Sequence, residues 1–259
     1  MAQFIACNMI LAAALTSALA QSPMDSTTFE VASIRPNAAD DNRFMFRGGP
    51  GLTAAGVTLK FLVVHAYDVL AYQISGGPGW MSTDRWDIRA KAGNIKIRLQ
   101  SEQFLTMLRA LLADRFQLKV HSETKEMSVY ALVVAKNGPK LTPRSGPSQD
   151  TRVGWGSLSL QKGGTAALAY WLSRQLGRTV IDKTELKGEY NFKLEWQPEP
   201  GGGVEALGLP PNPQPSQPAD TNRPSIFTAV QEQLGLRLDA RKRPVEIIIV
   251  DHAERPSEN

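Results

Sequence analysis

The chain has 259 residues, of which 42% are hydrophobic and 21% are charged, a composition typical of a globular protein with a sizeable core. Its formal net charge is +4, and the basic residues are spread along the sequence. The one dense basic run, RLDARKR at 237–243, is interrupted by Asp239 and flanked by strand-like segments. These features argue against a nucleic-acid partner and favour a solvent-exposed hairpin face for this run.

The first predicted element is a signal peptide over residues 1–20. An uncharged apolar run ends in Ala18-Leu19-Ala20, a small-x-small pattern that signal peptidase accepts, so the mature chain would begin at Gln21. No Lys or Arg precedes the run, which is unusual for such a signal. The run barely reaches the length of a membrane anchor, about 20 apolar residues. We therefore expect an exported protein, periplasmic or extracellular, with no stable membrane span after cleavage.

Cys7 is the only cysteine, and it lies inside the predicted signal peptide. In a lipoprotein the acylated cysteine ends the apolar run, whereas most of the run follows Cys7. Cleavage would leave a mature chain with no cysteine. Disulfides, thiol nucleophiles and cysteine-bound metals are therefore not expected.

Residues 21–42 are expected to form a lead-in that contains the first strand. Apolar and polar residues alternate through Phe29, Val31 and Ile34, and Pro36 stops the strand.

Three later segments have the apolar stripe and the caps of amphipathic helices. The first, 101–116, opens with Ser101 as N-cap. Its apolar side chains form one stripe: Phe104, Leu105, Leu108, Leu111 and Leu112. The other two helices are expected at 165–177 and 225–235, with these caps: Gly177, Ser225 and Gly235.

The sequence indicates an internal duplication of a helix–strand–turn–strand unit. Residues 111–141 align with 229–256 once two residues are dropped from the turn, so that VYALVV at 129–134 matches VEIIIV at 245–250.

A second pair of segments also aligns. Residues 83–92 match 188–196, which places Asp87 opposite Asn191, and each segment follows a helix that a G-x-T sequence introduces. The two G-x-T sequences are at 56–58 and 163–165.

The duplication predicts a first α+β half at 43–152 and a second at 153–259. A Pro/Gly-rich stretch without periodicity, 197–224, is expected to be a linker or insertion within the second half. The expected fold class is α+β, with duplicated helix–strand–strand units, mostly antiparallel sheets, and helices packed on one face.

The glycine-rich stretch GGPGW at 76–80 is predicted to be a turn. It precedes a strand, whereas the glycines of a dinucleotide site open a helix, and Pro78 lacks the backbone N–H that a phosphate cradle uses. The strand that follows is expected to carry three residues on one face: Trp86, Ile88 and Ala90.

The three histidines do not indicate a metal site. His65 lies on an apolar stretch and is expected to be hydrogen-bonded and half-buried, whereas His121 and His252 are expected at the surface near strand ends. None has a second ligand at metal-binding spacing, so neither a metal nor another cofactor is predicted.

No catalytic residue is assigned. There is no G-x-S-x-G sequence, so a serine nucleophile is not indicated. Asp182 most simply shapes a turn. A hydrolase that uses scattered carboxylates stays open as an alternative, and its candidates are Asp84, Asp87, Asp182, Glu185 and Asp251.

Two tryptophans, Trp80 and Trp155, lie beside glycines in predicted loops. A flat aromatic side chain in such a place can contact a peptide or a glycan. We name these two as candidate contact residues for a ligand or partner.

Long collinear stretches of the chain resemble a large paralogous family of exported proteins of unknown function from soil acidobacteria. The stretches are 29–37, 76–92, 111–141, 180–196 and 224–259. Related domains are sometimes fused to membrane metallopeptidases of the BlaR type, so the resemblance implies sensing or binding in the periplasm. It supplies no catalytic residues. In outline, the helix–strand–strand units are also similar to the N-terminal domains of secretins and TonB-dependent receptors.

The sequence therefore indicates a non-enzymatic binding or interaction domain with a protein, peptide or glycan partner in the cell envelope. Two alternatives remain: the secreted hydrolase, and a sensor or adaptor of an envelope complex.

Overall fold

A computed structural model describes residues 27–37, 44–93, 96, 98–99, 101–144, 150–154, 156–198 and 223–257. The predicted signal peptide, Trp155 and most of the Pro/Gly-rich stretch lie outside the described residues. The fold is α+β with mostly antiparallel sheets, as predicted. In the described part of the chain, no helix has the length and hydropathy of a membrane-spanning segment.

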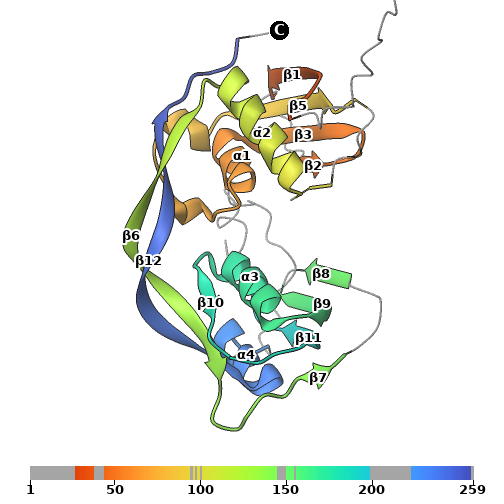
Figure 1. The fold of residues 1–259 in the computed structure, drawn as a ribbon, viewed down its shortest axis with the longest axis vertical. Helices are drawn as coiled ribbons and strands as arrows, with labels where there is room; N and C mark the ends of the chain where they lie inside the picture. Colours follow the sequence, from red (N-terminus) through yellow and green to blue (C-terminus); the bar gives the residue numbers. More distant parts are fainter. Residues whose placement is uncertain are drawn as a thin grey trace, which may run out of the picture.

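Lobe 1 contains the first sheet and two helices. Its strands have the spatial order β1–β5–β3–β2, all antiparallel. The elements are β1 (Val31–Pro36), β2 (Met45–Arg47), β3 (Gly51–Thr58), α1 (Leu59–Ala66), β5 (Arg85–Lys91) and α2 (Glu102–Arg115). The helices cover one face of the sheet (Figure 1), and that face is buried through Ile34, Leu52 and Ile88.

Lobe 2 repeats this arrangement. Its strands have the order β7–β11–β9–β8, again antiparallel. The elements are β7 (Thr142–Pro143), β8 (Asp150–Gly154), β9 (Ser157–Gly163), α3 (Thr165–Leu176), β11 (Tyr190–Glu195) and α4 (Ile226–Leu234). A second core packs between this sheet and its helices, around Leu160, Leu172 and Phe192.

A long two-stranded ribbon connects the lobes. It consists of β6 (Lys119–Val134) and β12 (Leu236–His252), which pair antiparallel over almost their whole length. One short parallel strand extends each side, β4 (Ile74–Gly76) beside β12 and β10 (Val180–Asp182) beside β6. Figure 1 shows the ribbon along one side of both lobes. Two 3₁₀ turns, η1 (Ala71–Gln73) and η2 (Gly79–Ser82), flank β4.

The helix caps predicted from the sequence are confirmed. The hydroxyls of Ser101 and Ser225 accept hydrogen bonds from backbone N–H groups in the first turns of α2 and α4. Gly177 and Gly235 end α3 and α4 with φ of 60° and 63°, in the left-handed region that favours glycine. The predicted stripe of α2 is buried throughout: Phe104, Leu105, Leu108, Leu111 and Leu112.

The turn predicted inside each long repeat unit is wrong. The chain continues as one strand through 122–127 and through 241–244, the run assigned to a hairpin face. The two segments lie side by side in the ribbon. The backbone groups that each strand directs toward the other are hydrogen-bonded, so no turn is needed to satisfy them. The basic run is solvent-exposed as expected, but it lies on a continuous strand.

The two repeat units exchange strand ends. VYALVV at 129–134 of β6 pairs with the start of β12 in lobe 2, while VEIIIV at 245–250 of β12 pairs with the start of β6 in lobe 1. Leu132 and Leu236 accordingly belong to the lobe 2 core, and Val250 belongs to the lobe 1 core. The boundaries of the two predicted halves stay a prediction.

The aligned residues Asp87 and Asn191 occupy equivalent places. Asp87 Oδ1 accepts a hydrogen bond from the N–H of Gly56 at 3.0 Å, and Asn191 Oδ1 accepts one from the N–H of Lys162 at 3.3 Å. Gly56 and Lys162 have φ of 64° and 59° at matching β-bulges. The G-x-T alignment is therefore wrong by one residue, because Gly56 corresponds to Lys162 and not to Gly163.

Candidate functional site

The GGPGW stretch forms a turn that packs against the ribbon. Gly76 ends β4 and Gly77 follows it, with φ of 77° and 75°, and a Cβ on Gly77 would meet Met81 and Val250. The next strand, β5, buries Trp86, Ile88 and Ala90 on one face, as predicted. The glycines provide backbone conformation and close packing.

Trp80 packs against the lobe 1 core and is half-buried. The guanidinium of Arg255 lies over its ring, 5.2 Å from the ring centre, and Arg255 Nε donates to Asp84 Oδ2 at 2.8 Å. One face of the indole is thus already engaged within the chain. The interpretation of Trp80 and Trp155 as contact residues stays a prediction.

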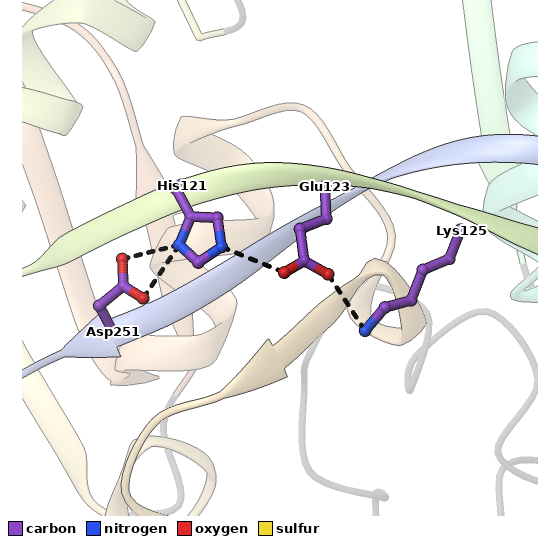
Figure 2. A network of polar contacts seen from close by, with 4 residues as sticks. All are labelled: His121, Glu123, Lys125 and Asp251. Atoms are coloured by element: carbon purple, nitrogen blue, oxygen red, sulfur yellow. Dashed lines mark hydrogen bonds and ion pairs between the residues drawn. The ribbon is translucent and has the colours of Figure 1, made fainter.

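The exposed face of the ribbon carries a polar network that contains His121 (Figure 2). His121 Nδ1 lies 2.9 Å from both carboxylate oxygens of Asp251 on the neighbouring strand, and Nε2 lies 3.3 Å from Glu123 Oε1. Lys125 Nζ continues the row, 3.4 Å from Glu123 Oε2. Hydrogen bonds that the carboxylates of Asp251 and then Glu123 accept from its ring raise the pKa of His121, and the bond from His121 lowers the pKa of Glu123.

His121 and His252 are at the surface, as expected. Their carboxylate partners were not predicted from the sequence. Glu123 is two residues from His121, the spacing that places side chains on one face of a strand. The contact with Asp251 follows from the pairing of β6 with β12, which the predicted turns concealed. His252 Nε2 similarly lies 2.8 Å from Glu254 Oε1.

His65 is half-buried in α1, as expected. Its Nδ1 lies 2.9 Å from the carbonyl oxygen of Phe61, and the ring packs against Phe61 and Phe46. Burial lowers the pKa of His65 to about 4. This histidine is therefore neutral near pH 7.

The two lobes meet directly at an ion pair between a buried arginine and a half-exposed aspartate. Arg174 on α3 has a side chain only 7% exposed, and its Nη2 lies 2.5 Å from Asp68 Oδ1, just beyond α1. The guanidinium also lies over the Tyr170 ring, 4.6 Å from its centre. A second contact joins Tyr72 in η1 to Thr179 before β10, with 2.5 Å between the hydroxyl oxygens.

The candidate carboxylates of a hydrolase are dispersed. Asp182 Oδ1 accepts from the N–H and the hydroxyl of Thr184, and Oδ2 accepts from the Thr165 hydroxyl, so Asp182 shapes the turn after β10 as predicted. Partial burial opposes ionisation of Asp182, but the hydrogen bonds from Thr165 and Thr184 outweigh it and lower its pKa. Among the described residues, no two of the five candidates share a hydrogen-bonding partner: Asp84, Asp87, Asp182, Glu185 and Asp251.

An open hollow of about 360 Å³ lies on lobe 2 between β7 and the start of β11. Arg144 and Lys187 line it with Glu189 and Tyr190, and the two cationic residues are exposed. Within the described residues, no three His, Cys, Asp or Glu side chains are arranged to hold a metal ion.

The middle of the ribbon is exposed along 240–244 of β12 and 122–126 of β6, and it carries the cationic part of the basic run. Arg241, Lys242 and Arg243 are all exposed, and the Arg241 side chain is 58% exposed. The residues opposite them on β6 are Val129, Ser128 and Met127, none of which is acidic. These cations lie on a stretch of the strand pair that no third strand of the described residues borders, since β4 and β10 pair only with 248–250 and 130–132.

The family model of a protein of unknown function, DUF3738, matches residues 60–253. The chain belongs to the DUF3738 family. No curated protein and no solved structure matches it. Of the elements in the described residues, the matched region contains α2, α3, α4, both strands of the ribbon and all of α1 except its first residue, and it begins after β1, β2 and β3. The polar network, the contact between the lobes and the exposed basic run all lie within it.

Proposed function

We propose that this DUF3738 protein is a non-enzymatic binding module, exported to the cell envelope, that binds a protein or peptide partner through the middle of its ribbon. The observation that carries the proposal is the long β6–β12 pair, whose central residues are exposed on both faces between two packed lobes. A strand pair with free edges is a ready surface for association.

The export part of the proposal rests on the sequence. The apolar run that ends in Ala18-Leu19-Ala20 is the basis for cleavage before Gln21. N-terminal sequencing of the protein from the envelope fraction is expected to begin at Gln21. An intact Met1 on protein recovered from the cytoplasm would contradict export.

The hydrolase alternative has less support. Glycoside hydrolysis of the usual kind needs two carboxylates flanking one substrate bond. Asp84, Asp87, Asp182 and Asp251 instead lie at different places in the fold, and each bonds to its own neighbours.

Site-specific photo-crosslinking in exporting cells tests the binding function. A photoreactive amino acid replaces Thr124, which is exposed in the middle of β6. The matched control replaces Lys193 on β11, whose side chain is 80% exposed on lobe 2. We expect a discrete crosslinked product from position 124 and a much weaker one from position 193. Equal products from both positions, or none from position 124, would argue against binding through the ribbon.

A further inference from the structure

We propose that the outer edge of β12, at Ala240, Lys242 and Pro244, binds an extended acidic peptide of a partner protein by strand addition. The inference rests on the proposed function, because it names the partner of the same ribbon. It adds the chemistry of that partner and the backbone groups that hold it.

The direction of the backbone groups follows from one hydrogen bond. Gln73 Nε2, outside the ribbon, donates to the carbonyl oxygen of Glu246 at 2.9 Å, so the backbone of Glu246 faces away from β6. Backbone groups of alternate residues in a strand point to the same side. The N–H and C=O groups of Ala240 and Lys242, and the C=O of Pro244, therefore also face outward.

Among the described residues, none hydrogen-bonds to these outward groups. β4 pairs with β12 only at 248–250. Along 240–244, no described strand lies beside the outer edge of β12. Ala240, Lys242 and Pro244 are exposed. Pro244 lacks an N–H. Because its backbone nitrogen faces away from β6, no hydrogen bond between the two strands is lost, and Pro244 still pairs with Glu126. An added peptide would continue the sheet in line with β4.

The charges beside this edge favour a peptide with acidic side chains. Arg237 holds Asp239 through two hydrogen bonds of 2.6 and 3.0 Å, while the Arg241 contact with the same carboxylate is longer, at 3.5 Å. Lys242 and Arg243 make no ion pair with any described residue. The edge thus presents positive charge that carboxylates on a partner strand would neutralise.

An extended peptide fits these charges better than an anionic membrane does. Arg241 and Arg243 project from one face of the ribbon and Lys242 from the other, because side chains alternate along a strand. A flat membrane surface would contact one face only, whereas an added strand has side chains on both faces.

The same charges disfavour pairing between two copies of this edge. Each copy would bring Arg241, Lys242 and Arg243 against the same three cations, and like charges across a strand pair are destabilising. Charge repulsion therefore disfavours pairing of two β12 edges, whereas an acidic strand would be attracted.

Fluorescence anisotropy with three labelled peptides of about eight residues tests the proposal. The first alternates Thr and Glu, the second alternates Thr and Lys, and the third is the Thr-Glu peptide with alternate backbone nitrogens methylated. We expect the full mature chain to bind the first peptide and not the second. Methylation removes backbone N–H donors and keeps the charge, so it should weaken binding about tenfold. Equal binding of the methylated peptide would show attraction by charge alone and overturn strand addition.

Variants locate the site. Arg241→Ser/Arg243→Ser removes two charges from the edge, and Ala240→Pro removes one outward N–H with no change in charge. Each should weaken binding about tenfold. The control, Arg144→Ser/Lys187→Ser, removes the same charge from the lobe 2 hollow and should leave affinity unchanged. Thermal unfolding checks that all variants are folded. Equal loss in the control would overturn the assignment to β12.

One further outcome separates this inference from the proposed function. If no acidic peptide binds while position 124 still crosslinks, the ribbon binds a partner of other chemistry and the inference fails alone. Binding of phosphatidylglycerol vesicles that is lost in Arg241→Ser/Arg243→Ser, or self-association of the chain on sedimentation, would also overturn it in favour of a membrane or a second copy.

Discussion

Lobe 1 and lobe 2 share one order of elements, yet they carry opposite charges where they meet. Asp68 lies ten residues after Thr58, the N-cap of α1, and Arg174 lies ten residues after Gly164, the N-cap of α3. Equivalent positions of the repeat therefore contact each other. In a symmetric dimer of identical units, the residue at this position would meet the same residue of the other copy. In a duplicated chain the two positions can differ, so that an acidic residue contacts a basic one.

A second difference lies within the cores. His65 is seven residues after the cap of α1, and Trp171 is seven residues after the cap of α3. Both rings pack in their own lobe, but only the histidine can gain a proton as the pH falls below 7. The comparison implies that mild acid, above the pH range in which carboxylates titrate, destabilises lobe 1 more than lobe 2.

Acidification should give the largest effect. The pKa of His65 falls from 6.5 in the unfolded chain to about 4 in the fold, so its contribution is complete above pH 6.5 and is lost as pH falls toward 4. The loss should reach about 3 kcal/mol of unfolding free energy. Denaturant unfolding between pH 7 and pH 4 measures it, and His65→Phe should flatten the curve.

Hydrogen exchange can assign this loss to one lobe. At pH 4.5, the protection factors of α1 and α2, which correct for the slower intrinsic exchange in acid, should be lower than at pH 7, while those of α3 and α4 should change less. His121 acts with the opposite sign, because its raised pKa gives stability that is lost as pH rises above 6.5. Its effect therefore lies outside the acid window. Equal acid sensitivity of both lobes would contradict the assignment to His65.

Removal of the acid at the contact between the lobes comes next. Asp68→Ala leaves the buried Arg174 guanidinium without its carboxylate and should lower the free energy of unfolding by about 2 to 3 kcal/mol. Arg174→Met removes the buried charge itself and leaves the half-exposed Asp68, so it should lower the free energy less. Urea unfolding of both variants measures the difference. If Arg174→Met were the more harmful, the contact would act through packing and not through charge.

Local structure could be predicted from the sequence where few residue types can occupy a position. Ser101, Ser225, Gly177 and Gly235 mark helix ends because hydroxyl capping and left-handed φ are each met by few residue types. The strand that buries Trp86 could likewise be predicted from alternation.

The ribbon could not be predicted, because its pairing joins residues more than a hundred positions apart. The polar residues at 122–126 are equally suited to a turn and to an exposed strand, and only the pairing with β12 selects the strand. The network of His121 with Asp251 depends on that pairing, so it was missed as well. The bulge alignment failed for a different reason, since Lys162 adopts the left-handed conformation in which a glycine was expected.

The acceptors at the two bulges should differ in strength. Asp87 Oδ1 accepts from Gly56 and also from Asn37 Nδ2 at 2.8 Å, whereas Asn191 Oδ1 accepts only from Lys162 among the described residues. Asp87→Ala should lower the free energy of unfolding by about 2 kcal/mol and Asn191→Ala by about 1 kcal/mol. Asp87→Asn keeps an acceptor and serves as the control. Equal losses in a thermal-denaturation series would mean that the second bond to Asp87 adds nothing.

The bulge residues themselves should give the smallest and most asymmetric effects. Gly56→Ala puts a Cβ on a residue with φ of 64° and should lower the free energy of unfolding by about 1 to 2 kcal/mol. Lys162→Gly relieves the same strain at φ of 59°, but it makes the unfolded chain more flexible and removes an ion pair with Glu189. These contributions oppose each other, so the change should stay within about 0.5 kcal/mol. Guanidinium unfolding of both variants measures the asymmetry, and a loss above about 1 kcal/mol in Lys162→Gly would mean that the lysine side chain stabilises lobe 2 more than its backbone strains it.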